Sequence, residues 1–377
     1  MFNFQTLSRI DLRVLPIILA LQAIGLLVIS AFSGDLFGEG EETFFTPVVI
    51  HQLQFIAMGW GVFFLVAAFD YNKLREWTWL FYTVMIFLLI GLFFTDPIQR
   101  VHRWYRIPIL GFSFQPSEYA KLVVVIALSW YLERRRSQAD SWSTALYGGL
   151  IAGIPFILIL KQPDLGTALV LFPITLVMFY FGDIRPSVVK GMIAAGGAAL
   201  VCVGLLFLGV VSHEEARPYA SFVLKDYQFD RLDPNTPHQK AAVTAIALGG
   251  LMGKGWRKSE YTGGGWLPAP YTDSVFPAFG EEFGFAGLFL ILVLFYALIY
   301  FSFQVTAVAS DPFGRLLSAG VTVYLAMHIL VNIGMMTGLL PITGVPLVLV
   351  SYGGSSILST MTALGILQSI YSRRFMF

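Results

Sequence analysis

Long apolar runs, repeated from one end of the chain to the other, limit what this sequence can fold into. A run of about 18 or more apolar residues crosses a hydrocarbon core of about 30 Å as a helix, and such runs recur throughout the 377 residues. Only 12% of the residues are charged, against roughly 25% in soluble domains. No sizeable soluble domain fits between the runs. The sequence therefore predicts an all-α polytopic integral membrane protein, with one membrane domain over residues 1–377.

The runs predict about ten transmembrane helices with both termini on one side. We place them near residues 14–33, 48–69, 77–95, 116–132, 145–161, 166–182, 188–211, 276–303, 314–338 and 346–370. The first run is long and is expected to be a retained span, not a cleaved signal peptide. Half of the 24 Lys and Arg residues fall on the side of the termini, which the positive-inside rule makes cytoplasmic. Residues 212–275, between spans seven and eight, then form one large extracytoplasmic loop.

Ionisable residues of the predicted spans gather at their outer ends. Glu118 and Lys121 lie one helical turn apart at the start of span four, Asp164 opens span six, and Asp273 and Glu281 lie at the start of span eight. An ionisable residue at membrane depth is by default a functional-site hypothesis, and helix N-termini favour anionic groups such as phosphate. The inner halves of the spans hold almost no charge. The sequence therefore predicts chemistry at the outer leaflet.

Structural roles compete for each of these residues. Glu118 and Lys121 are also what an ion pair between packed helices requires, and Asp164 is well placed to cap a helix. For Asp273 the alternative role is that of an ordinary solvated carboxylate in a loop. Glu281 lies near a helix start, where the helix dipole favours an acid without any function.

Other motifs carry weaker indications. SYGGSS (351–356), in the outer half of span ten, supplies Ser351 and Ser355 as candidate substrate contacts, with close helix packing as the alternative. His328 and Asn332, one turn apart on span nine, favour an interhelical hydrogen bond over a metal pair. GLMGKGW (250–256) lacks phosphate-loop spacing and a preceding strand, so a nucleotide site is not expected. A net charge of +1 gives no reason to expect a nucleic-acid partner.

Several longer motifs resemble one known family. They are Arg103-Trp104 followed by QPSEYAK (115–121), KQPDLGTA (161–168), DYQFDR (226–231), GKGW (253–256), TDSVFP (272–277), GEEFG (280–284) and the stretch from 332 to 356. In this order, over essentially the full length, they resemble the SEDS family (shape, elongation, division, sporulation) of peptidoglycan glycosyltransferases. The chain departs from the family pattern at Ala241-Ala242 and Ala247-Leu248, and between Gln228 and Asp233, where it is shorter.

The resemblance implies polymerisation of lipid II, the undecaprenyl-diphosphate-linked disaccharide, at the outer face of the cytoplasmic membrane. The family's essential acid matches Asp273, which would be the general base of an inverting transfer. Arg103, Lys121, helix dipoles and a divalent cation (Mg²⁺ or Mn²⁺) are the candidates that would stabilise the leaving diphosphate, and no organic cofactor is expected. Asp164 and Glu118 would orient Lys121 and the outer ends of the helices, and Glu281 would support the site or contact the metal.

The same resemblance implies a class B penicillin-binding protein, a transpeptidase, as partner, together with membrane lipids. The short amino-terminal tail favours the RodA type over the FtsW type. Two other functions compete with polymerisation. A flippase for lipid-linked oligosaccharide would need polar groups accessible from both sides, and a non-catalytic scaffold for a transpeptidase would tolerate loss of Asp273.

Overall fold

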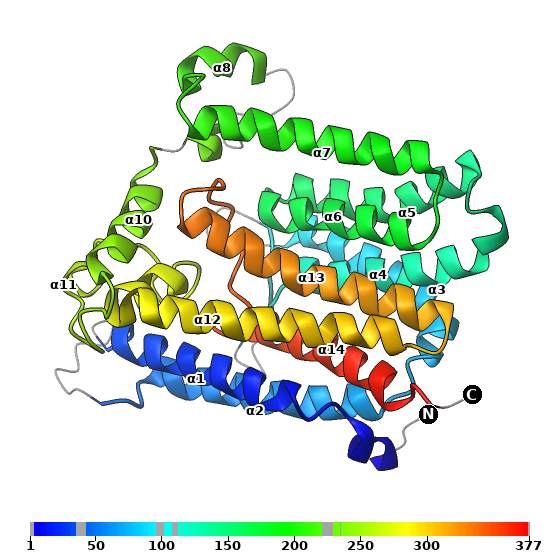
Figure 1. Cartoon of the computed structure of the whole chain (residues 1–377), viewed down its shortest axis with the longest axis horizontal. Coiled ribbons are helices and arrows are strands. Elements are labelled where there is room, and N and C mark those ends of the chain that lie inside the picture. The colour runs from blue at the N-terminus through cyan, green and yellow to red at the C-terminus, as the bar shows by residue number, and fades with distance from the viewer. Residues whose placement is uncertain are drawn as a thin grey trace.

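The computed structural model describes residues 4–34, 43–95, 102–107, 112–220, 229–233 and 235–375. Long helices run side by side in one bundle, and α1 begins at the end of the bundle where α14 ends (Figure 1). The long helices are α1 (Val14–Phe32), α2 (Pro47–Ala68), α3 (Lys73–Gly91), α4 (Pro116–Arg134), α5 (Trp142–Lys161), α6 (Leu165–Phe181), α7 (Pro186–Phe207), α12 (Val275–Val308), α13 (Pro312–Met336) and α14 (Gly354–Ser372).

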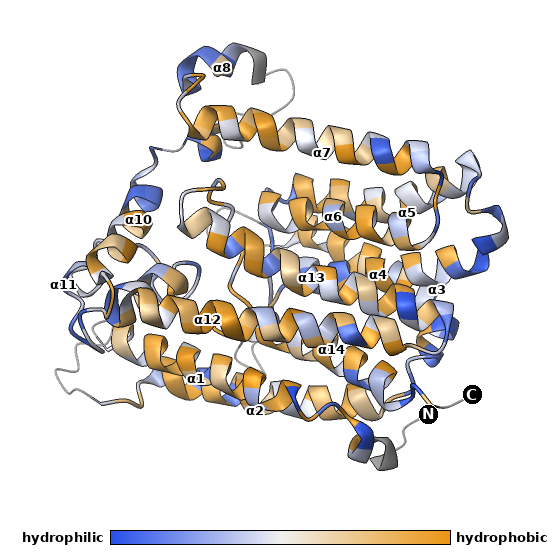
Figure 2. Ribbon diagram, viewed as in Figure 1, coloured by the Kyte–Doolittle hydropathy of each residue, from blue (hydrophilic) through white to orange (hydrophobic). Residues whose placement is uncertain are grey.

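Short elements connect the long helices. They are η1 (Phe4–Arg9), η3 (Leu92–Phe94), the antiparallel strands β1 (Tyr105–Ile107) and β2 (Phe112–Phe114), η5 (Arg136–Gln138), α8 (His213–Ala220), η6 (Asp230–Leu232), α10 (Pro237–Gly249) and α11 (Glu260–Gly263). Apolar residues dominate the long helices, and hydrophilic residues gather in the connections at the two ends (Figure 2). The protein is therefore a multi-pass, all-α membrane protein.

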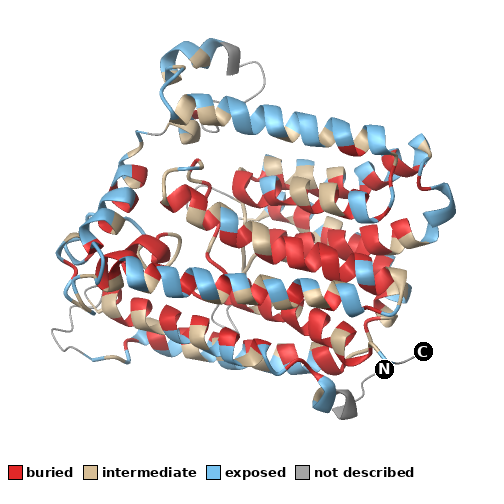
Figure 3. Ribbon diagram, in the orientation of Figure 1, coloured by how far each residue is buried: buried red, intermediate tan, exposed pale blue. Residues whose placement is uncertain are grey.

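Each predicted span corresponds to one long helix in the described part of the chain. Seven of these helices are long and apolar enough to cross a membrane. Of the others, α6 has 17 residues, and α4 and α14 carry too many polar residues to meet the same criterion. Both α4 and α14 are buried over most of their length, inside the bundle (Figure 3). Because neighbouring helices shield them from lipid, their polar side chains find partners in protein.

The predicted start of the last span, residue 346, is wrong. Helix α14 begins at Gly354, and the apolar residues before it are not helical. The Gln52 side chain of α2 pairs with this segment, donating Nε2 to the Ser351 carbonyl at 3.3 Å and accepting from the Gly353 amide at 3.3 Å. The Gln52 side chain thus takes the place of backbone hydrogen bonds that a continuous helix would form here. SYGGSS therefore spans the helix start and does not lie inside the helix.

Helix α12 is broken at Gly284, whose φ of 64° is not helical. The backbone groups freed by the break pair with the segment 250–255. The Lys254 amide donates to the Glu281 carbonyl at 2.9 Å, and the Phe285 amide donates to the Gly250 carbonyl at 2.9 Å. The glycine-rich motif that did not match a phosphate loop thus satisfies a helix break in the outer part of the bundle.

The large loop of residues 212–275 contains short helices that pack on the bundle. Within the segment that departs from the family pattern, α10 lies against α12 with Ala241, Ala242 and Ala245 buried. A Cβ at Gly249 would lie 2.0 Å from the Gly280 carbonyl oxygen. Small residues therefore let the two helices approach closely. Residues 226–228 of the DYQFDR motif and Arg100 lie outside the described residues.

Helix α7 lies at the edge of the bundle, next to α6 (Figures 1 and 3). Among its residues only Val189 is buried. Most of its side chains are exposed in the structure, Cys202 among them, as is expected of a helix that faces lipid.

Candidate active site

A polar cavity of about 840 Å³ lies at the end of the bundle opposite the start of α1 and the end of α14. We call it the polar cavity. Segments far apart in the sequence build its wall, from the β1–β2 region, η6, α10, the start of α12 and the start of α14. Its lining includes Arg103, Trp104, Ser113, Gln115, Asp230, Arg231, Thr236, His238, Thr272, Asp273, Thr343, Gly344, Tyr352, Gly353 and Ser355.

The backbone at Asp273 is held by neighbouring segments. Asn332 of α13 donates its Nδ2 to the Asp273 carbonyl at 3.0 Å and to the Val345 carbonyl at 2.8 Å. Ser351 donates its Oγ to the Thr272 carbonyl at 2.6 Å. Within the described residues, no amide or side chain donates a hydrogen bond to the Asp273 carboxylate. The residue is thus fixed by its main chain while its carboxylate faces the cavity.

The surroundings of Asp273 make it a stronger base than an exposed aspartate. Burial raises the pKa of its carboxyl, and the negative charge of Asp164 adds to that rise. The guanidinium groups of Arg103 and Arg231 act in the opposite direction and lower the pKa, without cancelling the effect of burial. A carboxylate whose pKa is raised by desolvation is suited to accept a proton near neutral pH.

Arg103 is anchored to the turn between α5 and α6. Its Nε donates to the Gln162 carbonyl at 3.3 Å, its Nη2 donates to the Pro163 carbonyl, and its Nη1 lies 4.0 Å from Asp164 Oδ1. The side chain is mostly buried, yet it lines the polar cavity. The structure therefore gives the cavity one firmly oriented cation, at a residue that the sequence predicted.

Asp164 orients this cation and the start of α4. It caps α6, with Oδ1 accepting from the Thr167 amide at 3.4 Å, and its Oδ2 accepts hydrogen bonds from Gln115 and Ser117, each at 3.1 Å. The capping role weighed in the sequence analysis is present. Its charged neighbour is Arg103 and not Lys121, so the prediction that Asp164 orients Lys121 is wrong. Its contacts with the starts of α4 and α6 agree with the prediction that it orients the outer helix ends.

Lys121 and Glu118 lie inside the bundle, away from the lining of the polar cavity. The Lys121 ammonium is fully buried, 2.8 Å from Glu118 Oε1 and 2.6 Å from His328 Nε2 of α13. This arrangement matches the structural ion pair, here within α4, and it contains the interhelical hydrogen bond predicted for His328. Because every contact of the ammonium is internal, Lys121 is not placed to contact a diphosphate in the cavity.

Glu281 also lies outside the lining. Its carboxylate accepts hydrogen bonds from the amides of Tyr261 and Thr262, at 3.0 and 2.9 Å, and from the Thr262 hydroxyl at 2.5 Å. It thus holds α11 against α12. This geometry gives Glu281 a structural role and leaves it no free oxygen directed at the polar cavity.

The polar cavity does not fit a resident divalent cation beside Asp273. Two guanidinium groups already act on that carboxylate, and the other acid of the lining, Asp230, pairs with Arg217. Among the described residues, no three His, Cys, Asp or Glu side chains are grouped as metal ligands.

The two candidate serines have different positions. Ser355 lines the polar cavity, donating its Oγ to the Ser113 carbonyl at 2.8 Å and accepting from the Gln115 amide at 3.1 Å. It ties β2 to the start of α14. Ser351 instead holds the segment before Asp273 and accepts from the Leu347 amide at 2.9 Å. Of the pair, only Ser355 is placed to contact a ligand.

Sequence reasoning missed two residues of the cavity wall. Arg231 is the last residue of the DYQFDR motif. Its place in a motif shared with the family was the signal that could have identified it. His238 lies in the segment that departs from the family pattern, and its Nε2 lies 2.8 Å from Ser274 Oγ, beside Asp273. Burial lowers the pKa of His238, so its imidazole is neutral at neutral pH.

The model of the family named for FtsW, RodA and SpoVE, described as a cell cycle protein, matches residues 12–374. The chain belongs to this family. The SEDS resemblance of the sequence motifs is thereby confirmed, and the match leaves almost no part of the chain outside the family.

Relatives of several types match this SEDS protein along nearly their whole length. The peptidoglycan glycosyltransferase MrdB of Escherichia coli K12 is 31% identical, over 97% of this chain and 94% of that protein. The stage V sporulation protein E of Bacillus subtilis is 32% identical, over 96% and 98%. A probable peptidoglycan glycosyltransferase FtsW of Geobacter sulfurreducens is 29% identical, over 98% and 97%.

Solved structures share the fold. A chain from a study of how a peptidoglycan synthase complex coordinates polymerization and crosslinking superposes with a TM-score of 0.75, at 24% identity, over 98% of this chain and 99% of that chain. The rod shape determining protein RodA of Thermus thermophilus gives a TM-score of 0.69, at 23% identity, over 98% of each chain. At these identities the superposition establishes the SEDS fold.

Proposed function

We propose that the protein is a peptidoglycan glycosyltransferase that polymerises lipid II into glycan strands at the extracytoplasmic face of the cytoplasmic membrane. Curated relatives that carry this enzyme name match over nearly the whole chain. The observation that carries the proposal is the polar cavity, where a carboxylate free of hydrogen-bond donors within the described residues faces two guanidinium groups.

In this mechanism Asp273 is the general base. Its carboxylate takes the proton of the acceptor sugar's 4-hydroxyl while that oxygen attacks the anomeric carbon of the donor. The bond from this carbon to the diphosphate breaks on the opposite face, so the configuration inverts. Main-chain contacts from Asn332 and Ser351 hold Asp273 in place before substrate binds, which limits the reorganisation needed during the reaction.

Arg103 and Arg231 supply the positive charge for the leaving group. Both line the polar cavity, and guanidinium groups bind phosphate oxygens in a fixed, often bidentate geometry. The negative charge that develops on the departing diphosphate is therefore stabilised by two cations that lie far apart in the sequence. Lys121, whose contacts are all internal, does not take part in this mechanism.

The side of the membrane and the partner belong to the same proposal. The basic connections lie at the end of the bundle away from the polar cavity, and by the positive-inside rule this supports a cavity on the extracytoplasmic side. A fold shared with a chain of a peptidoglycan synthase complex supports a class B penicillin-binding protein as partner. Relatives named MrdB and FtsW both match the chain, so the proposal covers cell-wall growth of either type.

The test compares wild type with Asp273→Asn in a polymerisation assay on labelled lipid II, with and without a cognate transpeptidase. Loss of a general base typically costs about 10²- to 10⁴-fold in rate, so we expect glycan ladders to disappear from the gel for the variant. Asp233→Asn is the matched control, because Asp233 is an acid of the same loop that does not line the polar cavity.

Equal ladders from wild type and Asp273→Asn would exclude the general base and leave a scaffold as the better description. If the folded wild type makes no polymer even with its partner, the polymerase proposal itself fails, and translocation of lipid II across vesicles would be measured next.

A further inference from the structure

A second cavity, of about 620 Å³, lies at the other end of the bundle, where α3, α4 and α5 meet. We call it the arginine-lined cavity. It is near the end of α4 and the short η5, at the end of the bundle where α14 ends (Figure 1). Its polar end is formed by Arg134, Arg135, Ser137 and Gln138. No step of the proposed reaction uses these residues.

The two arginines carry uncompensated charge. Arg134 stacks on the Trp130 ring at 4.9 Å, and Arg135 donates to Gln138 Oε1 at 2.6 Å. Within the described residues neither forms an ion pair. The adjacent acid, Glu133, is taken by Arg75 at 2.9 Å. Two cations therefore stand at the mouth of one cavity without an anion from the protein.

A buried hydroxyl of the cavity wall also has no partner. Tyr131 is only 8% exposed and lines the arginine-lined cavity, yet its hydroxyl makes no hydrogen bond in the described structure. An unpaired buried polar group is costly, and most such groups are paired in native proteins. The hydroxyl and the two guanidinium groups together make a donor set for a phosphate oxygen.

The rest of the cavity is apolar and open to lipid. Leu150, Ile151 and Ile154 of α5 form one wall, and the Trp79 and Trp130 rings pack edge to face at 5.3 Å. Tryptophan and tyrosine prefer the headgroup level of a bilayer. A ligand that places an anion at the arginines would thus lay an apolar chain along α5.

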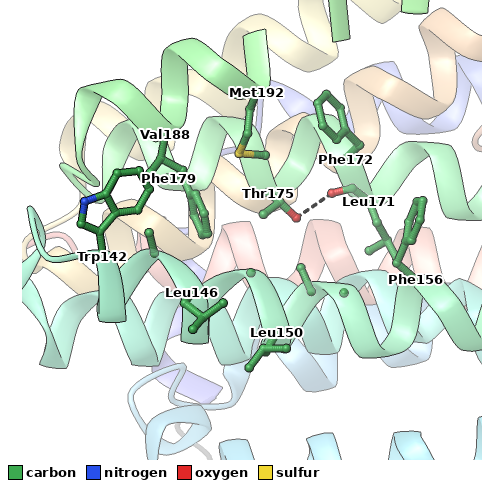
Figure 4. A pocket seen from close by; sticks show the side chains of 14 residues that line it. Trp142, Leu146, Leu150, Phe156, Leu171, Phe172, Thr175, Phe179, Val188 and Met192 are labelled. Atoms are coloured by element: carbon green, nitrogen blue, oxygen red, sulfur yellow. Dashed lines mark hydrogen bonds between the residues drawn. The ribbon is translucent and has the colours of Figure 1, made fainter. Parts of the chain in front are cut away.

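The other side of α5 carries an apolar groove of about 470 Å³, shared with α6 and α7 (Figure 4). Leu150 lines both the groove and the arginine-lined cavity. The Thr175 hydroxyl in the groove is satisfied by the Leu171 carbonyl at 2.8 Å, so this hydroxyl is not free to bind a ligand. Two apolar channels on either side of Leu150 suit a ligand with two hydrocarbon chains.

We propose that the arginine-lined cavity binds an anionic phospholipid from the leaflet on the side of the chain termini. Its phosphate contacts Arg134, Arg135 and the Tyr131 hydroxyl, and its acyl chains lie on either side of Leu150. Basic pockets between transmembrane helices on the cytoplasmic side are known to hold anionic headgroups. The site is independent of Asp273 and of the glycosyl transfer.

The test is native mass spectrometry of the full chain in detergent, titrated with phosphatidylglycerol or with phosphatidylethanolamine. We expect wild type to retain phosphatidylglycerol at lower concentration than the zwitterionic lipid. A basic residue near an anionic lipid contributes about 1 kcal/mol, so Arg135→Gln should weaken phosphatidylglycerol binding about fivefold. Tyr131→Phe, which removes only the unpaired hydroxyl, should weaken it severalfold.

Arg136→Gln is the matched control. Arg136 follows Arg135 in the chain and carries the same charge, but it lines a different cavity, near Arg315. The Arg136→Gln variant should bind phosphatidylglycerol as tightly as wild type does. Equal retention of both lipids by wild type, an equal loss in Arg135→Gln and Arg136→Gln, or unchanged binding in Tyr131→Phe would each overturn the proposal.

Discussion

Asp273 shows how opposite effects on one carboxyl set the conditions for its chemistry. Burial raises its pKa, and the two arginines of the polar cavity hold that rise back. A general base works only when deprotonated, so activity falls as the pH drops through this pKa. Because the pKa is raised, we expect the acid side of the pH–rate profile to lie at higher pH than for an ordinary aspartate.

Arg231→Gln should move that acid limb further toward higher pH. The substitution removes a cation that lowers the pKa of Asp273, so the carboxyl then holds its proton to a higher pH. The maximal rate should also fall, because one contact to the leaving group is lost. The measurement is the polymerisation rate across a pH series. Lys240→Gln, on an exposed cation of α10 outside the polar cavity, should leave the limb in place, and an unmoved limb in Arg231→Gln would contradict the expectation.

The residues that sequence reasoning placed correctly and those it misplaced differ in one respect. Asp273 and Arg103 lie in connections at the ends of predicted spans, where several connections meet, and both side chains line the polar cavity. Lys121 also lies at the outer end of a predicted span. The direction of its side chain, however, depends on α13, which brings His328 to the ammonium. Helical spacing shows that Glu118 and Lys121 share a face; it does not show which neighbour covers that face.

At the scale of elements, the break in α12 depends on close contact between two backbones. A Cβ at Gly253 would lie 2.1 Å from the Glu282 carbonyl oxygen, and the φ of Gly253 is 82°, in the region that favours glycine. The amides of the segment 250–255 can therefore reach the carbonyls freed at the break only if this residue has no side chain.

Gly253→Ala should lower the stability of the protein clearly. A strained backbone position costs about 1–3 kcal/mol, and the clash with backbone adds to it. Thermal unfolding in detergent measures the effect. Gly263→Ala is the control, since a Cβ there meets nothing within 4 Å. Equal melting temperatures for Gly253→Ala and wild type would show that the segment moves away from α12 without loss.

Hydropathy predicted the position of every long helix because burial in lipid demands continuous apolar runs. It could not predict the helix start at Gly354 or the break at Gly284. At both places backbone hydrogen bonds pass to another segment, to Gln52 in one case and to residues 250–255 in the other. Such exchanges depend on tertiary contacts, so a local pattern does not contain them.

At the scale of the whole molecule, the orientation of the bundle decides which compartment supplies the substrate. The polar cavity and the arginine-lined cavity lie at opposite ends. Only one of the two ends can face the extracytoplasmic side, and from the distribution of basic residues we expect that end to be the one with the polar cavity.

Cysteine labelling tests the orientation. The native Cys202 is the only cysteine of the chain, so Cys202→Ala gives a background free of thiols. In intact cells with a permeable outer layer, a membrane-impermeant maleimide should label Asn235→Cys, in the large loop, and not Ser137→Cys, in the connection after α4. Both positions are exposed. After lysis both should react, and labelling of Ser137→Cys before lysis would reverse the orientation.

The composite wall of the polar cavity also has a consequence for how the protein is made. Arg103 is synthesised before α4, whereas Gly344 and Ser355, together with the Ser351 that holds the segment before Asp273, are synthesised only after α13. A nascent chain with most of its helices inserted thus has its cations but not its completed pocket. In the proposed mechanism, glycan synthesis therefore begins only after the residues up to Ser355 have been made, and a chain that stops earlier does not polymerise the wall.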